Sequence, residues 1–165
     1  MKNAKHFHEL YVNKSIVSKI LKRITTLIVF LVTLNCSNTP QAINYGNDGC
    51  YYCKMTIVDK LHAAEIVTQK GKVYTFDASE CMVNFLKEFD ASKVKLYLTT
   101  NYLTPEELID ATSATFLISK GIPSPMGAFV SAFKNKNDAV KSQSEKGGDL
   151  YSWDELLIHF KNKNK

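Results

Sequence analysis

The chain has 165 residues, of which 45% are hydrophobic, and a formal net charge of +5 at neutral pH. Residues 1–35 hold six of the 21 basic and one of the 16 acidic residues, so the remainder carries 15 of each and is neutral. A nucleic-acid-binding domain needs a basic face on its folded part, so this balance argues against a nucleic-acid partner. The remainder is long enough to form one domain with a buried core.

The first 35 residues have the pattern of an export signal. A basic flank precedes the apolar run at 24–34, which is shorter than the ~20 residues of a membrane-spanning helix. We therefore expect residues 1–35 to be a lipoprotein signal peptide. Cys36 follows like the cysteine of a bacterial lipobox and is predicted to carry the lipid, although cleavage nearby would instead leave it a free thiol. With 36–48 as a flexible tether, the predicted location is the cell envelope, lipid-anchored to a bacterial membrane and facing the periplasm.

The first half of the expected domain contains three strands and one clear helix. β-Branched and aromatic residues predict strands at 63–68, 72–76 and 95–99. Lys70-Gly71 predicts the turn of a hairpin, and a helix over 79–89 is expected to begin at a cap, either Asp77 or Ser79. Thr104 followed by proline predicts a second, short helix.

The second half repeats this order. Strands are expected at 114–118, 128–133 and 150–151, and helices at about 137–145 and from Ser152 onward. The pattern predicts an α+β fold in which two tandem ββαβ units, at about 56–103 and 112–160, form one compact domain spanning 49–160.

Sulfur-bearing side chains cluster in the motif Cys50-Tyr51-Tyr52-Cys53-Lys54-Met55. Thiolate and thioether ligands select soft Cu(I), so this spacing predicts a Cu(I) site on Cys50, Cys53 and Met55. Met126, in the loop at 121–127, is a further predicted ligand. Cys81 and His62 are candidates for additional ligands, Cys81 alternatively being a core residue.

Other interpretations of the same thiols stay open. Zinc normally takes four Cys or His ligands, whereas a redox enzyme of the cell envelope would use Cys50 and Cys53 for thiol–disulfide exchange. A plain disulfide between these two residues is a third alternative. Asp77 is expected either to cap the helix or to hydrogen-bond to a ligand. The sequence has no phosphate-binding glycine loop, zinc-protease motif or nucleophile elbow, so we expect a binding protein and not an enzyme.

The order of these motifs resembles the NosL family. The residues that carry the resemblance are Cys50-x-x-Cys53-x-Met55, 71–77, Asp110-Ala111, Pro125-Met126-Gly127, Ala132-Phe133 and Gly147-Gly148. Lys54 departs from the family, which usually has glycine there, and so does Ala128, where many members have histidine.

The resemblance implies a fold of two ββαβ units, similar to the organomercurial lyase core. It also implies a membrane-anchored metallochaperone that delivers Cu(I) to nitrous oxide reductase, the copper enzyme of denitrification, or to its maturation machinery. On the residues alone, Cys53, Cys81 and Asp77 could imitate the paired thiols and acid of a heavy-metal lyase, but fold analogy is no evidence of activity.

Overall fold

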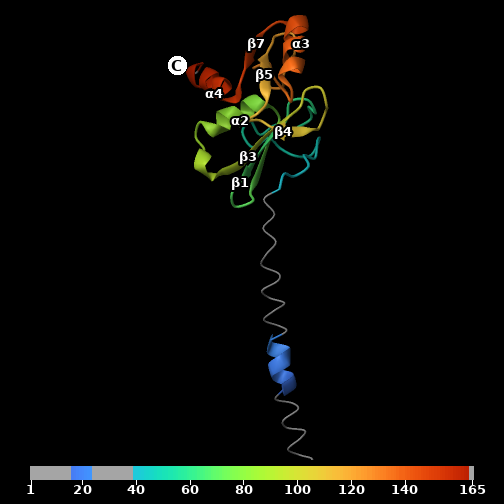
Figure 1. The fold of residues 1–165 in the computed structure, drawn as a ribbon, viewed down its shortest axis with the longest axis vertical. Helices are drawn as coiled ribbons and strands as arrows, with labels where there is room; N and C mark the ends of the chain where they lie inside the picture. Colours follow the sequence, from blue (N-terminus) through green and yellow to red (C-terminus); the bar gives the residue numbers. More distant parts are fainter. Residues whose placement is uncertain (1–15, 24–38, 164–165) are drawn as a thin grey trace, which may run out of the picture. The chain divides into compact units, whose positions relative to one another are not determined.

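The computed structural model describes residues 16–23 and 39–163, and the chain separates into two units, Met1–Ser37 and Asn38–Lys165 (Figure 1). In the first, residues 16–23 are helical and their side chains are exposed.

The apolar run at 24–34 and Cys36 lie outside the described residues. The signal peptide and the lipidation site therefore stay predictions. Among the helices that the structure describes, none has both the length and the apolar character needed to cross a membrane.

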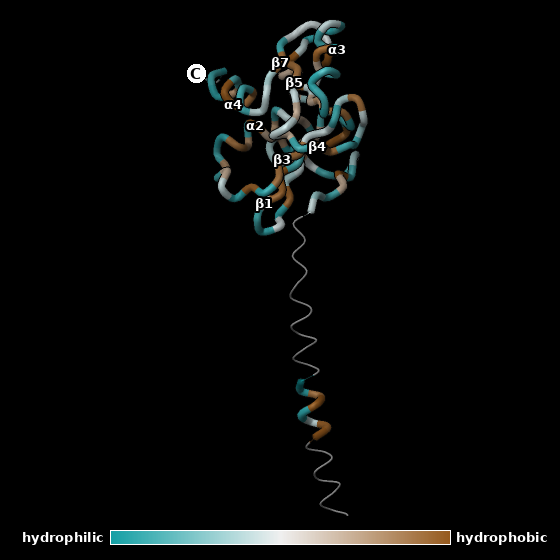
Figure 2. The backbone as a smooth tube through the Cα atoms, in the orientation of Figure 1, coloured by the Kyte–Doolittle hydropathy of each residue, from teal (hydrophilic) through white to brown (hydrophobic). Residues whose placement is uncertain are grey.

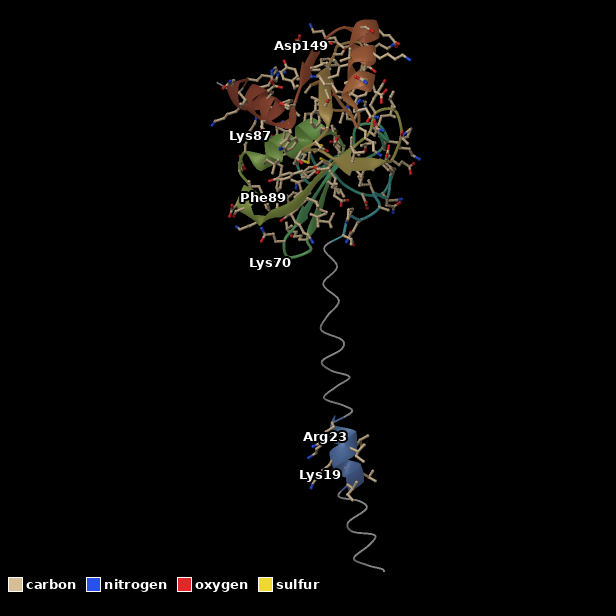
Figure 3. All side chains as sticks on the ribbon, viewed as in Figure 1. Lys19, Arg23, Lys70, Lys87, Phe89 and Asp149 are labelled. Carbon is tan, nitrogen blue, oxygen red and sulfur yellow. The ribbon has the colours of Figure 1, made fainter. Side chains whose placement is uncertain are left out.

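The second unit contains a four-stranded antiparallel sheet with the strand order β2-β1-β3-β4 (Figure 1). The strands are β1 Ala64–Thr68, β2 Val73–Phe76, β3 Val94–Thr100 and β4 Leu108–Asp110. All five side chains of β1 are buried, and the strand lies between β2 and β3. The predicted hairpin turn is present: Gly71 takes a left-handed φ of 79°, and Lys70 lies at the end of the domain opposite Asp149 (Figure 3).

Helix α2 follows β2 and spans Ser79–Leu86. The prediction of a side-chain cap at Asp77 or Ser79 is wrong: Ala78 is the N-cap residue, and no side chain caps the helix. The hydroxyl of Ser79 instead shares a 2.6 Å hydrogen bond with that of Thr99 on β3. The helix also ends three residues before the expected Phe89. A 3₁₀ turn at Ala91–Lys93 then leads into β3.

The second sheet has three antiparallel strands in the order β6-β5-β7. The strands are β5 Thr115–Ile118, β6 Val130–Phe133 and β7 Asp149–Tyr151, and the helices are α3 Lys136–Lys146 and α4 Trp153–Asn162. Helix α4 begins where predicted, because Ser152 and Glu155 form a reciprocal capping box.

The predicted short helix at Thr104 is not formed. Residues 102–106 form a turn that leads into β4. Glu106 has a left-handed φ of 67°, which a right-handed helix cannot contain. Its carboxylate forms an ion pair with Lys60 at 2.6 Å, and the backbone N–H of Asn101 donates to the carbonyl of Glu107. These contacts fix a turn where the Thr-Pro pattern predicted a helix.

The two sheets share a large apolar core. In Figure 2 parts of β1 and β3 are brown, the colour of hydrophobic residues. A bridge between Asn101 and Ala132 links β3 to β6, and Phe76, Phe116 and Leu156 are completely buried at the centre. The α+β class and the tandem ββαβ order are confirmed. The likeness to the organomercurial lyase core stays an expectation.

Candidate metal centre

A tight turn before β1 holds the Cys-x-x-Cys motif. An antiparallel bridge joins Gly49 to Thr56, the Cys50 N–H donates to the Met55 carbonyl, and the Lys54 N–H donates to the Cys50 carbonyl. Lys54 has a left-handed φ of 67°. This conformation favours glycine, which gives a physical reason for the glycine usual at this position in proteins that the motif resembles.

The other half of the site comes from the connection between β2 and α2. The N–H of Tyr51 donates to the carbonyl of Thr75 at 2.8 Å, so the turn is fastened to β2. Since β2 ends at Phe76, Asp77 follows directly beside the turn, and the first turn of α2 carries Cys81.

Four side chains consequently converge. The three sulfur atoms of Cys50, Cys53 and Cys81 and a carboxylate oxygen of Asp77 all lie within 4.8 Å of one another. The thiol of Cys53 donates to Asp77 Oδ1 at 3.6 Å. Cys50, Cys81 and Asp77 are at most 2% exposed, whereas Cys53 is half-buried. The three cysteines in the described part of the chain are free thiols. The site is thus open to solvent at Cys53 and closed behind it.

The three thiols have different pKa values because they hydrogen-bond to one another and are buried to different degrees. A hydrogen bond from Cys81, with support from groups of Asp77 and Cys53, lowers the pKa of Cys50 to about 6. The same bond raises the pKa of Cys81, and burial raises the pKa of Cys53. Thiolates are the form that binds metal, so the cluster offers one at the buried end.

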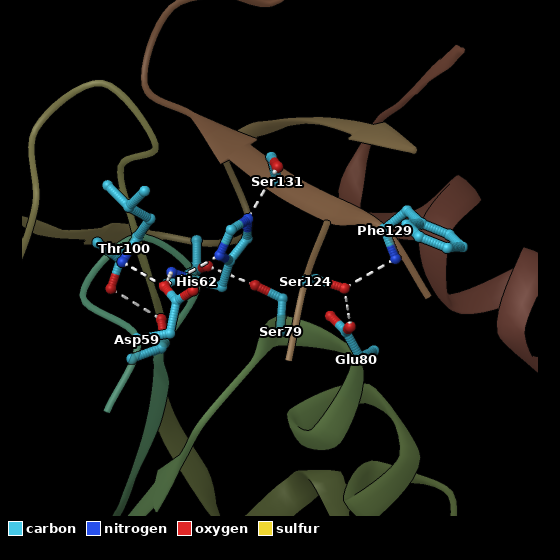
Figure 4. Close-up of polar contacts among 11 residues, drawn as sticks. Asp59, His62, Ser79, Glu80, Thr100, Ser124, Phe129 and Ser131 are labelled. Carbon is cyan, nitrogen blue, oxygen red and sulfur yellow. Dashed lines mark hydrogen bonds and ion pairs between the residues drawn. The ribbon is translucent and has the colours of Figure 1, made fainter. Parts of the chain in front are cut away.

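The two predicted thioether ligands lie at the surface. Met55 is 47% exposed and Met126 is 42% exposed. Met126 occupies a turn in which the Gly127 N–H donates to the carbonyl of Ser124. The hydroxyl of Ser124 accepts from the Phe129 N–H at 2.8 Å and donates to the buried carboxylate of Glu80, the residue before Cys81 (Figure 4).

His62, the remaining candidate ligand, is not among the four converging residues. Its side chain is buried, with Nδ1 at 3.0 Å from Asp59 and Nε2 at 3.2 Å from the hydroxyl of Ser131 (Figure 4). Both ring nitrogens therefore already have partners within the protein.

The sequence analysis named Cys81 as a candidate ligand and Asp77 as either a helix cap or a hydrogen-bond partner of a ligand, but it did not decide between these roles and their alternatives. The structure places both residues beside Cys50 and Cys53. The available signal was topological: the motif precedes a β-hairpin whose second strand ends at Phe76, so its return brings the following residues back beside the motif. A hollow of about 460 Å³ between α2 and α4 has no thiol, thioether or histidine in its lining and is separate from this centre.

The NosL family model matches residues 41–159. The chain belongs to the NosL family. The crystal structure of the copper chaperone NosL from Shewanella denitrificans is similar to the domain, with a TM-score of 0.64 and 26% identity, and the match covers 72% of this chain and 96% of that chain. No curated protein matches the chain significantly. The family expected from the ordered motifs is confirmed.

Proposed function

We propose that this NosL-family chain is a copper metallochaperone that binds Cu(I) at Cys50 and Cys53. The observation that carries the proposal is the convergence of three free thiols within 4.8 Å. Sulfur donors favour soft metals, of which Cu(I) is one. The similar protein from Shewanella denitrificans is described as a copper chaperone, which supports the same role here. Met55 or Met126 would assist as thioether ligands, from positions at the surface.

A chaperone must also release its metal, and the half-buried position of Cys53 suits this requirement. An incoming ligand of the client can add to copper from the solvent side while the buried Cys50 still holds it. The client that family membership favours is nitrous oxide reductase or its maturation machinery. Lipidation at Cys36 would hold the chaperone at the membrane, in the cell envelope.

The geometry of the three thiols fits a thiol–disulfide exchange enzyme less well than a metal-binding protein. An exchange enzyme attacks its substrate with an accessible thiolate of lowered pKa. Here burial raises the pKa of the accessible thiol, Cys53, while the thiol of lowered pKa, Cys50, is only 1% exposed. The arrangement therefore suits metal binding better than disulfide exchange.

The experiment is an anaerobic titration of the reduced full chain, in detergent, with Cu(I) against a chromophoric chelator. A Cys36→Ser variant serves as the control, because it removes the predicted lipidation site and leaves Cys50, Cys53 and Cys81 unchanged. We expect tight binding in both, and a loss of about a hundredfold or more in affinity in a Cys50→Ser/Cys53→Ser variant. Equal, weak binding in all three proteins would refute the proposal. In cells, Cys36→Ser should move the chain from the membrane to the soluble fraction, and retention at the membrane would refute the lipid anchor.

A further inference from the structure

We propose that Cys81 completes a three-thiolate site with Cys50 and Cys53, so that Cu(I) is held in a trigonal arrangement by sulfur from two separate segments. The proposal rests on the proposed function and specifies its ligand set. Cys50 and Cys53 come from the turn before β1, whereas Cys81 comes from the first turn of α2, 28 residues beyond Cys53.

The spacing of the sulfur atoms suits this geometry. Three sulfurs that each lie about 2.3 Å from a metal in one plane are separated from one another by about 4 Å. The Sγ atoms of Cys50, Cys53 and Cys81 lie within 4.8 Å of one another. Side-chain adjustments of less than an ångström would close the triangle around a metal, without any movement of the turn or the helix.

Burial separates the thiols from the thioethers. Cys81 is completely buried and Cys50 is 1% exposed, so the two form the closed inner side of the centre, with Cys53 on the solvent side. Met55 and Met126 are each more than 40% exposed. The sulfur that the structure places beside Cys50 and Cys53 is the thiol of Cys81, whereas the two thioether residues are largely open to solvent.

The carboxylate of Asp77 fits a positioning role beside copper. Its Oδ1 accepts a hydrogen bond from the Cys53 thiol at 3.6 Å, and Asp77 is 2% exposed. Oxygen is a hard ligand that Cu(I) does not favour, whereas Zn²⁺ accepts Asp together with Cys in a tetrahedral site. The same four residues would therefore bind copper through three sulfurs and zinc through three sulfurs and one oxygen.

The test is X-ray absorption at the copper edge on the full chain loaded anaerobically with one Cu(I). All variants carry Cys36→Ser, so that the three thiols of the centre are the only cysteines. We expect three sulfur neighbours in this parent protein and two in Cys81→Ser, with about a tenfold or larger loss of affinity. The Met55→Leu/Met126→Leu and Asp77→Asn variants should keep all three sulfurs.

The methionine variant keeps the test decisive even if Cys81→Ser fails to fold. A third sulfur that persists without both surface thioethers assigns it to Cys81, with Met82→Leu as the control for the neighbouring thioether. The proposal is overturned by two sulfurs in the parent, by a third that disappears with the methionines, or by unchanged coordination in a folded Cys81→Ser. In each of these outcomes copper is still bound through Cys50 and Cys53; absence of copper binding in the parent would instead refute the proposed function.

Discussion

Replacement of Glu65 by glutamine is expected to stabilise the domain above neutral pH. Glu65 is completely buried in the central strand β1. Its Oε1 accepts a hydrogen bond from the Gln41 N–H at 3.1 Å, and its Oε2 has no hydrogen-bond partner among the residues that the structure describes. Burial raises the pKa of this carboxyl from 4.5 to about 7, because a charge on an unpaired buried group is poorly solvated.

The size and sign of the effect follow from linkage. Between pH 4.5 and about 7 the folded chain binds a proton at Glu65 that the unfolded chain has released, so the free energy of unfolding falls as pH rises through this range. One pKa unit corresponds to about 1.4 kcal/mol. The free energy of unfolding therefore falls by about 3 kcal/mol in total. None of this fall is present below pH 4.5, and all of it is present above pH 7 to 8.

The assay is denaturant unfolding of the reduced, metal-free chain from pH 4.5 to 8.5, followed by the fluorescence of Trp153, the single tryptophan, which is 7% exposed. The difference between wild type and Glu65→Gln isolates this one carboxyl from the other titrating groups. That difference should shift in favour of the variant by about 3 kcal/mol between the two ends of the range. A difference that stays constant with pH would refute the reasoning.

Three further outcomes are expected. Lys54→Gly should stabilise the domain by about 1 kcal/mol relative to Lys54→Ala in the same unfolding assay, because φ is 67° there; equal stability of the two variants would contradict the strain. Leu156→Ala, at a completely buried site in α4, should cost about 2–5 kcal/mol, whereas Ile158→Ala on the exposed side should change stability by about 0.5 kcal/mol or less; similar losses would contradict the packing. Brief alkylation of the metal-free folded chain should label Cys53 before the two buried thiols, as peptide mapping would show, and early labelling of either buried thiol would contradict the access described.

Much of the fold could be predicted, because its signals are local. The β-branched strands around Lys70-Gly71 and the Ser152 capping box depend on residues within a few positions of one another. The strand β4 was missed for the opposite reason. It has three residues, Leu108–Asp110, and depends on pairing with β3. So short a strand leaves no local sequence pattern, and the Thr-Pro signal at Thr104 therefore predicted a helix.

The metal centre was half predictable for the same reason. Cys50 and Cys53 are three residues apart, so their spacing alone predicts that the two thiols lie together. Cys81 reaches them only because the β1–β2 hairpin and the start of α2 bring it back beside the motif. Asp77 has the sequence position of a helix cap. Its side chain contacts Cys53 instead, because Ala78 takes the extended N-cap conformation. Which role an aspartate takes before a helix is decided by the neighbouring segment.

Two buried carboxylates show the same dependence on residues that are distant in the sequence. Glu65 and Glu80 sit where sequence suggests an exposed acid, one on a strand and one in the first turn of a helix. Each is at most 1% exposed and has one carboxylate oxygen without a hydrogen-bond partner in the described part of the chain. The partners Gln41 of Glu65 and Ser124 of Glu80 are 24 and 44 residues away in the chain. Glu80 directly precedes Cys81, and its partner Ser124 begins the turn that contains Met126. The domain therefore has one destabilising buried carboxylate next to a residue of its thiol centre, and natural proteins commonly give up stability at functional sites.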